Sequence, residues 1–389
     1  MDISRYLGRP TWVEIDLSKL AANVRELRRF LPAGVQLLAV VKADAYGHGS
    51  YEVADVALRE GATMLGVASL EEGKSLRKKG ISAPILVLGY TDPGQSSSML
   101  EMQLTPTILN WKAAVVFSQL ARGQGKQAAV HVKLDTGMGR LGLHNPQEAM
   151  HFLEKIASLP GIMLEGVYTH FAQADATDPG FTLHQLNVFK NILQACQEKG
   201  IFIPLKHAAN SAAALKFPQA HFDLVRVGIG LYGYSPAPNL QTGAPQLLPV
   251  MSLKSRIVFI KEVSAGAPIS YGGIYTTPKK TTIATVALGY ADGYNRLLSN
   301  RGAMLVGGKR TPVAGRVCMD YTMLDVGEVP LAREGDEVVA FGSQGCAEIG
   351  ADELARLLGT ISYEILCNTS KKVPRVYCEK GTVKDIKIF

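Results

Sequence analysis

The sequence predicts an α/β protein in which a (β/α)8 TIM barrel is followed by a mostly-β C-terminal domain. Eight short apolar segments, with amphipathic helices between most of them, fit within about 200 residues, which is the size of such a barrel. Beyond about residue 243, the pattern changes to alternating, β-branched segments separated by Gly and Pro turns. We therefore expect a barrel over residues 17–243 and a β domain over 244–389, with residues 1–16 pairing into the β domain.

Composition places the chain among soluble globular proteins with enough apolar residues for two cores. Of its 389 residues, 47% are hydrophobic and 19% charged, and the formal net charge is +7. The basic residues are scattered, so we expect small anionic ligands rather than nucleic acid. Five cysteines without a C-x-x-C pair argue against a metal site and a disulfide framework. No signal core or membrane-length apolar segment is evident, so we expect a cytoplasmic protein without a membrane partner.

The helices and strands are predicted from the spacing of apolar residues and from the residues that begin or end helices. After an opening strand over 11–16, a helix is expected with Ser18 as its cap, because leucine and valine recur at helical spacing over 20–31. Later helices begin at Asn145-Pro146 or end at Gly61, Gly80 and Gly200. The eight barrel strands are expected over residues 37–41, 64–68, 85–88, 105–109, 129–134, 164–170, 205–209 and 224–229, and β-domain strands over 257–260, 282–286 and 337–341, with one helix near 352–358.

Polar residues decide between two α/β architectures. Periodicity alone does not close a barrel, so a doubly wound sheet is the alternative. Several polar residues fall at or just past the carboxyl ends of different strands, which is where a TIM barrel collects its active site. This placement favours the barrel; the residues are Lys42, Arg140, His170, Asn210 and Arg226.

Lys42 follows the first barrel strand directly. Desolvation at such a position lowers the pKa of an ammonium group, which suits a lysine that forms a Schiff base or acts as a general base. The alternative is a lysine that merely extends its charged end to solvent. Position alone leaves both interpretations open.

Two segments match G-x-G-x-x-G, at Gly137–Gly142 and Gly228–Gly233. Neither begins the first βαβ unit, and the second continues to Pro236 instead of a helix, so we reject a dinucleotide site. A glycine after the eighth strand nevertheless lets backbone N–H groups approach a phosphate, and Asn210-Ser211 adds a hydroxyl and a helix start. The alternative is ordinary turn glycines with a helix cap.

Three further residues are candidates for an active site, and each is more convincing together with the others than alone. Arg226 lies inside an apolar strand and needs a partner or a ligand, for which His207 on the neighbouring strand is suited. Arg140, on the glycine-rich loop after Lys133, suits bidentate binding of a carboxylate, the alternative being a surface ion pair. Tyr271 lies in a tight glycine turn and is a useful base only if its pKa is lowered.

Together these residues resemble the alanine racemases, which are pyridoxal-phosphate enzymes. The resemblance covers nearly the whole chain in order, and no catalytic position departs from the pattern. It rests on the segments 41–49, 133–142, 168–171, 207–211, 226–233, 270–272, 287–293 and 316–320.

The resemblance implies a role for each candidate. Lys42 would bind pyridoxal 5′-phosphate as a Schiff base and serve as the base on the D-face, while Tyr271 serves the L-face with help from His170. Arg226 would face the pyridine nitrogen, and an arginine there weakens the electron sink and favours simple proton exchange. Arg140 would bind the substrate carboxylate, oriented by Lys133, which is often carbamylated in this family, and Met319 would exclude bulky side chains. The expected phosphate and cofactor ligands are Tyr46, His207, Asn210, Ser211, Gly228, Ile229 and Tyr363.

The implied activity is two-base interconversion of L-alanine and D-alanine, which supplies D-alanine for bacterial cell walls. The implied assembly is a head-to-tail homodimer in which Tyr271, Tyr290 and Met319 reach the partner's site. The alternative is a broad-specificity amino-acid racemase of the same architecture. A decarboxylase is disfavoured by Arg226, and a cofactor carrier by the second domain.

Overall fold

The computed structural model describes residues 8–236 and 243–388, and the chain divides into two compact units. The barrel unit consists of Leu20–Ala45 and Ser50–Leu248. The β unit consists of Met1–Lys19, Tyr46–Gly49 and Pro249–Phe389. The segment Tyr46–Gly49 thus groups with the β unit, although it lies within the range 17–243 expected for the barrel.

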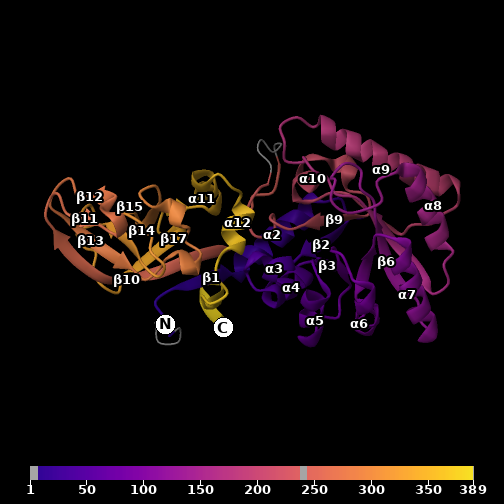
Figure 1. Cartoon of the computed structure of the whole chain (residues 1–389), viewed down its shortest axis with the longest axis horizontal. Helices are drawn as coiled ribbons and strands as arrows, with labels where there is room; N and C mark the ends of the chain where they lie inside the picture. The colour runs from indigo at the N-terminus through magenta and orange to yellow at the C-terminus, as the bar shows by residue number, and fades with distance from the viewer. Residues whose placement is uncertain (1–7, 237–242, 389) are drawn as a thin grey trace. The chain divides into compact units, whose positions relative to one another are not determined.

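The barrel unit contains eight parallel strands in which each strand lies beside its neighbour in sequence (Figure 1). The order runs from β8 back to β2, and β9 then pairs with β2. Backbone bonds from Asp223 N to Lys206 O (3.1 Å) and from Arg226 N to Ala209 O (3.0 Å) join β9 to the β8 segment. The sheet is therefore nearly closed, which confirms the predicted TIM barrel against a doubly wound sheet. The strands are β2 (Gln36–Val40), β3 (Met64–Val67), β4 (Ile85–Val87), β5 (Thr105–Ile108), β6 (Ala128–Lys133), β7 (Ile162–Tyr168), β8 (Leu205–His207) and β9 (Leu224–Val227).

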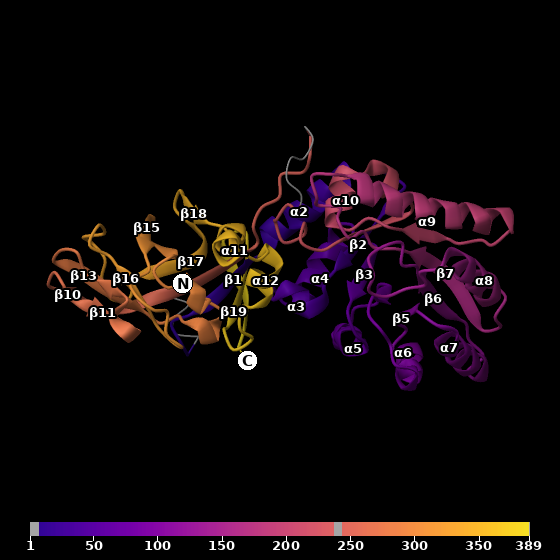
Figure 2. The same ribbon diagram turned by 45° about the horizontal axis from the view of Figure 1, so that its top comes forward.

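Amphipathic helices cover the outside of these strands (Figure 2). In α8, for example, Ala149, Phe152, Leu153 and Ile156 recur at helical spacing and are buried, and the Asn145 side chain caps the helix start. The helices are α2 (Leu17–Phe30), α4 (Ser50–Arg59), α5 (Leu70–Lys78), α6 (Ser96–Glu101), α7 (Trp111–Gly123), α8 (Pro146–Ala157), α9 (Gly180–Glu198) and α10 (Ser211–Lys216).

The start of α2 corrects one prediction. Ser18 does not cap the helix; the Asp16 carboxylate accepts hydrogen bonds from the backbone N–H groups of Ser18 (2.9 Å) and Lys19 (3.1 Å). Asp16 is the last residue of the opening strand, so the strand end itself supplies the cap, and a carboxylate is favoured at a helix N-terminus.

The turn after β2 has an unusual backbone. The segment α3 (Lys42–Tyr46) is left-handed, with φ between 51° and 54° from Ala43 to Tyr46. Such a conformation costs about 1–2 kcal/mol for each L-residue, so the surroundings must hold it in place. Carboxylates do so: Glu72 accepts from Ala43 N (2.7 Å), and Asp44 accepts from Ser50 N (2.8 Å). The direction in which Lys42 leaves β2 is thereby fixed.

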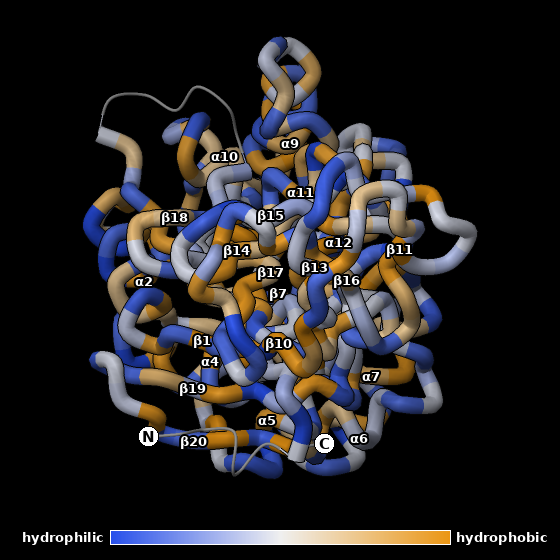
Figure 3. The backbone as a smooth tube through the Cα atoms, turned by 90° about the vertical axis from the view of Figure 1, so that its left-hand side faces the viewer, coloured by the Kyte–Doolittle hydropathy of each residue, from blue (hydrophilic) through white to orange (hydrophobic). Residues whose placement is uncertain are grey.

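The β unit is built on a sheet with the order β15-β14-β17-β10-β1-β19-β20. Strand β1 (Trp12–Asp16) lies antiparallel to β10 and parallel to β19, so the described part of the first sixteen residues belongs to this sheet; residues 1–7 lie outside the described residues. Buried and less buried residues alternate along the first seven residues of β10, and Figure 3 shows hydrophobic and hydrophilic parts of the backbone close to one another. The other elements are β10 (Met251–Val263), β11 (Pro268–Ile269), β12 (Tyr275–Thr276), β13 (Thr281–Val286), β14 (Ala303–Val306), β15 (Lys309–Pro312), β16 (Thr322–Asp325), β17 (Glu337–Gln344), β18 (Ala347–Ile349), α11 (Ala351–Leu358), α12 (Ser362–Cys367), β19 (Arg375–Glu379) and β20 (Thr382–Lys387).

Within the described residues, no helix combines the length and apolar character that crossing a membrane requires.

Candidate active site

Parallel pairing brings the expected polar residues of the barrel unit to one end of the sheet. Lys133, the last residue of β6, pairs with Tyr168 of β7, which in turn pairs with His207 of β8. Arg226 on β9 pairs with Leu38 of β2, four residues before Lys42. The carboxyl ends of five strands therefore contribute to one polar cluster, as expected for a barrel site.

Arg226 lies at the centre of this cluster and is 4% exposed. Its Nη1 donates to His207 Nδ1 (2.8 Å), which is the predicted pairing. Its Nη2 donates to the carbonyl oxygens of Thr169 (2.7 Å) and Ala208 (2.9 Å), and lies 3.3 Å from His170 Nδ1. Burial lowers the pKa of Arg226 to about 10, so the guanidinium stays charged at neutral pH. Four partners hold the plane of a buried cation in a single orientation.

His207 continues the hydrogen bonding into the barrel. Its Nε2 lies 2.8 Å from His131 Nδ1, and His131 Nε2 lies 3.1 Å from the Glu165 carboxylate. The Tyr168 ring stacks on the His207 ring at 4.7 Å with an interplanar angle of 9°. Tyr168, the last residue of β7, had no role predicted from the sequence. His131 and Glu165 carried no sequence signal, because these two lie inside strands, where a single polar residue is indistinguishable from a satisfied structural one.

His170 is held neutral. Burial, followed by the charges of Arg226 and Arg140, keeps the pKa of His170 well below its usual 6.5. Because Nδ1 faces the Arg226 donor, the ring proton belongs on Nε2, which leaves His170 a hydrogen-bond donor on its other side. The positive charges of Lys133 and Lys42 act on the same ring. The side chains of Arg226, Arg140, Lys133 and Lys42 therefore all lie in the region around His170.

Lys133 is almost fully buried and surrounded by positive charge. Burial, then Arg140 and Arg226, lower the pKa of Lys133 to about 8, and Lys42 contributes in the same direction. Roughly a tenth of Lys133 is therefore an uncharged amine at pH 7, a far larger fraction than for a lysine of ordinary pKa. That form is nucleophilic, and a negative product formed on it would be stabilised by the adjacent cations.

The loop from β6 to Arg140 is shaped by Asp135. Burial alone would raise the pKa of this carboxyl group, yet bonds from the N–H groups of Gly137 (3.0 Å), Gly139 (3.0 Å) and Arg140 (2.9 Å) lower it. Gly142 closes the loop at φ +124°, where a Cβ atom would lie 2.7 Å from Asp135 N. These contacts fix the shape of the loop, and Arg140 lies at its tip with an exposed side chain.

Backbone N–H groups and a hydroxyl lie close together where β9 ends. Gly228 N donates to Ser211 Oγ (2.9 Å), and the buried Ser211 begins α10, which is capped by the Asn210 side chain through Ala213 N. Ile229 follows in a turn with no exposed surface. Backbone N–H groups and a hydroxyl at a helix start are typical ligands of a phosphate.

The remaining expected site residues belong to the β unit. Tyr46 is buried, and its ring lies 5.8 Å from that of Tyr363. Burial, followed by Tyr363 and Cys367, raises the pKa of Tyr46, so its hydroxyl remains a donor.

Tyr271, Tyr290 and Met319 are 71%, 41% and 54% exposed on this unit. Hydrogen bonds link the segments that carry them. The Arg316 side chain donates through Nε to the carbonyl oxygen of Tyr271 (3.2 Å), and the backbone N–H groups of Tyr290 and Ala291 donate to the carbonyl oxygens of Cys318 and Met319 (both 3.0 Å).

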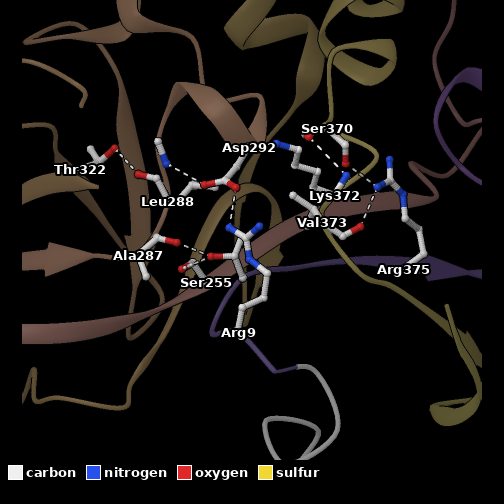
Figure 4. A network of polar contacts seen from close by, with 12 residues as sticks. Arg9, Ser255, Ala287, Leu288, Asp292, Thr322, Ser370, Lys372, Val373 and Arg375 are labelled. Carbon is white, nitrogen blue, oxygen red and sulfur yellow. Dashed lines mark hydrogen bonds and ion pairs between the residues drawn. The ribbon is translucent and has the colours of Figure 1, made fainter. Parts of the chain in front are cut away.

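A polar network supports the segment that carries Tyr290 (Figure 4). Asp292 accepts from Arg9 (2.5 Å) and from Gly289 N (3.1 Å), and the Asp292 carbonyl accepts from Ser370 N (3.1 Å). Arg375, which is 1% exposed, donates to the carbonyls of Ser370 (2.5 Å), Val373 (2.7 Å) and Gly47 (3.2 Å). The sequence pointed to only one part of this network, the segment 287–293, which is among the segments that carry the resemblance.

No group of three or more His, Cys, Asp or Glu residues is arranged to hold a metal ion in the described part of the chain.

Comparison with known proteins identifies relatives over the full length. Family models of the alanine racemase N-terminal domain and the alanine racemase C-terminal domain match residues 15–236 and 250–377. The alanine racemase of Desulforamulus reducens is 46% identical over 95% of this chain and 100% of its own, and that of Desulfosudis oleivorans is 48% identical over 94% and 96%. The solved structure of alanine racemase from Bacillus anthracis with bound L-Ala-P has a TM-score of 0.90 at 40% identity and covers 98% of each chain.

Proposed function

Because the chain belongs to the alanine racemase family, we propose that it interconverts L-alanine and D-alanine by a two-base mechanism at the carboxyl end of its barrel. The observation that carries this proposal is the cluster of Lys42, Lys133, His170, His207 and Arg226, in which the two histidines face one buried arginine. The names of the relatives favour alanine over the broad-specificity alternative.

The donor set of the barrel unit fits pyridoxal 5′-phosphate. A lysine after β2, an arginine held by neutral histidines, and the Ser211–Gly228 hydroxyl and amide pair match the aldehyde, pyridine nitrogen and phosphate of that cofactor. When bound, the cofactor would withdraw electrons from the α-carbon of the amino acid and so acidify its hydrogen. Arg226 is a poor proton donor, so the pyridine nitrogen would remain unprotonated and the withdrawal modest, which favours proton exchange over transamination.

Two side chains would exchange the α-hydrogen. Lys42 Nζ would hold or release the proton on the D-face and the Tyr271 hydroxyl on the L-face. The neutral His170 would adjust the acidity of this hydroxyl through its Nε2 hydrogen bond. Opposite bases on opposite faces make inversion the natural outcome, since the proton is removed on one side and returned on the other.

Substrate selection would depend on Arg140, Lys133 and Met319. Arg140, on its preorganised loop, would bind the alanine carboxylate. Lys133, as a carbamate formed from its neutral amine and CO2, would present a negative group that orients this arginine. Met319 would limit the space for the substrate side chain.

Phosphate binding would involve Tyr46, Ser211, Gly228, Ile229 and Tyr363, with Asn210 and His207 supporting their neighbours.

A homodimer with shared sites would complete the enzyme. Besides Tyr271 and Met319, the large apolar residues Ile274, Leu297 and Tyr321 of the β unit are 42%, 61% and 49% exposed. Hydrogen bonds from Asn300 to the Ile274 carbonyl (2.9 Å) and from Val317 N to Ser299 Oγ (3.0 Å) join the segments that carry them, and neighbouring exposed apolar residues are typical of a protein–protein contact. The expected setting is the bacterial cytoplasm, where the product D-alanine would serve cell-wall synthesis.

Two measurements test the proposal. Purified protein should absorb visible light, and borohydride reduction should remove this absorbance and leave the cofactor on Lys42, as found by peptide mass spectrometry. Incubation of single amino acids in deuterated water should then give inversion and α-deuteration of alanine, with much slower turnover of serine. A colourless protein that stays inert with added cofactor would contradict the proposal, and equal turnover of alanine and serine would favour the broad-specificity alternative.

A further inference from the structure

A row of hydrogen bonds extends from Arg226 into the barrel and ends at a carboxylate. The row passes from Arg226 Nη1 to His207 (2.8 Å), from His207 to His131 (2.8 Å) and from His131 to Glu165 (3.1 Å). Both imidazoles are fully buried, whereas the Glu165 side chain is 24% exposed. The proposed reaction requires Arg226, but it assigns no role to His131 or Glu165.

The two ends of the row fix every proton between them. Arginine can only donate, so His207 Nδ1 must accept and its proton must lie on Nε2. His207 Nε2 then donates to His131 Nδ1, which places the His131 proton on Nε2, opposite a carboxylate that can only accept. With both rings neutral, one arrangement satisfies all three bonds, and both histidines are Nε2–H tautomers.

Electrostatics support neutral rings. Burial lowers the pKa of both histidines, and the charge of Arg226 acts in the same direction, while Glu165 partly opposes this at His131. Among the described residues, the hydrogen bonds of Arg226 go to carbonyl oxygens and imidazoles and to no carboxylate. Glu165 therefore supplies negative charge at a distance, through two polarised rings.

We propose that Glu165 and His131 are positioning residues that lock the His207 tautomer, so that His207 always presents an acceptor to Arg226. This inference rests on the proposed function, in which Arg226 faces the pyridine nitrogen. A flipped His207 would place an N–H group against the Arg226 donor, and the guanidinium would lose one of its partners and its fixed plane. The remote carboxylate thus sets the geometry of a group that it does not touch.

The competing explanation is that Glu165 only fills space and stabilises the barrel. Variants separate the two roles, because Glu165→Gln keeps the shape and an acceptor oxygen, whereas Glu165→Leu keeps the approximate volume and removes the acceptor. Glu198→Leu, on the exposed face of α9, controls for the loss of a glutamate.

The test is ¹⁵N NMR of the histidine side chains in full-length enzyme with bound pyridoxal 5′-phosphate, combined with alanine kinetics. Wild type, Glu165→Gln and Glu198→Leu should show His131 and His207 as neutral Nε2–H tautomers, with kcat/KM within about threefold of one another. Glu165→Leu should show mixed tautomers and a kcat/KM lower by on the order of 10-fold, as for other groups that orient a functional imidazole. Its KM for alanine should change less than about twofold, because Arg140 and not Arg226 binds the substrate.

The wild-type spectrum alone can overturn the inference, since a charged ring or an Nδ1–H tautomer at either histidine contradicts it even if Glu165→Leu fails to fold. Wild-type tautomers and kinetics in a folded Glu165→Leu would equally reject it. Tautomers are read without turnover, so this inference can fail while racemisation by the wild-type protein stands. Absence of racemisation would instead reject the proposed function.

Discussion

At the scale of single residues, Tyr271 and Lys42 are expected to act on different enantiomers. Tyr271→Phe removes the L-face base, so racemisation should fall by on the order of 10²-fold or more. D-alanine should still exchange its α-hydrogen with deuterated water through Lys42, whereas L-alanine should not. Proton NMR of both enantiomers measures this directly, with Tyr90→Phe, an exposed tyrosine of the barrel unit outside the expected site residues, as control. Continued exchange of L-alanine at the wild-type rate would contradict the two-base mechanism.

The lowered pKa of Lys133 has a consequence for stability. In CO2-free buffer, the folded state holds fewer protons than the unfolded chain between pH 8 and the ordinary lysine value of 10.5. The free energy of unfolding of the wild type should therefore rise with pH across this window. Lys133→Met lacks the titrating group, so its stability advantage over the wild type should be largest at pH 8 and below and shrink towards pH 10.5. Urea titrations at several pH values measure this difference.

The control is Lys155→Met, which removes an exposed lysine and should show no comparable trend. If ¹³C-labelled bicarbonate is added near pH 8, the wild type should show a carbamate resonance that Lys133→Met lacks. A pH-independent difference in stability would show that Lys133 titrates normally, and absence of the resonance would reject carbamylation.

The clustering of polar residues was predictable where they followed a strand. Lys42, His170 and Arg226 stood out because each interrupts or ends an apolar segment, and the Arg226–His207 bond was predicted and is present. His131 and Glu165 were not found, because their bonds join residues 34 and 76 positions apart, and spacing of that length carries no local signal. Strand alternation also cannot tell the barrel interior from the face that the helices cover.

At the scale of elements, the glycine-rich loop between β6 and α8 is expected to depend on Gly142 more than on Gly139. Both have positive φ, but a Cβ at Gly142 would lie 2.7 Å from Asp135 N, whereas Gly139 has open space. Gly139→Ala should cost about 1–2 kcal/mol of stability from backbone strain alone. Gly142→Ala should cost about 3 kcal/mol or more and also raise the KM for alanine, because the Asp135 bonds that position Arg140 are displaced.

Thermal unfolding and steady-state kinetics compare the two variants, and each variant is the control for the other. Equal losses of stability would show that the loop tolerates displacement of Asp135. An unchanged KM for alanine in Gly142→Ala would show that the loop does not position Arg140 for substrate binding.

Elements were predictable to the extent that local patterns define them. All eight barrel strands lie where apolar segments indicated, because a buried parallel strand needs a short apolar segment. The left-handed turn at Ala43–Tyr46 had no such signal, since alanine and tyrosine disfavour positive φ and are held there by Glu72 and Asp44. The Asp16 cap was missed because the residue also ends a strand.

At the scale of the whole molecule, the sequence predicted the barrel and the β domain from a change of periodicity, but periodicity says nothing about a second chain. Tyr271 and Met319 lie on exposed surface of the β unit, which in one chain alone would leave the tyrosine that we propose as a base in solvent. A partner that covers this surface resolves the difficulty. Sedimentation velocity should accordingly show a dimer, and Ile274→Asp combined with Leu297→Asp should shift it towards monomer with loss of racemisation. A fully active monomer would refute a shared site.

The strongest test of shared sites is complementation between two inactive variants. Lys42→Ala and Tyr271→Phe should each form inactive homodimers. If every site takes its lysine from one chain and its tyrosine from the other, a mixed dimer carries both defects in one site and none in the other. Random reassortment makes about half of the dimers mixed, so unfolding and refolding the mixture should restore about a quarter of wild-type activity. If both residues came from the same chain, no mixed dimer would contain an intact site and activity would stay at the level of the separate variants.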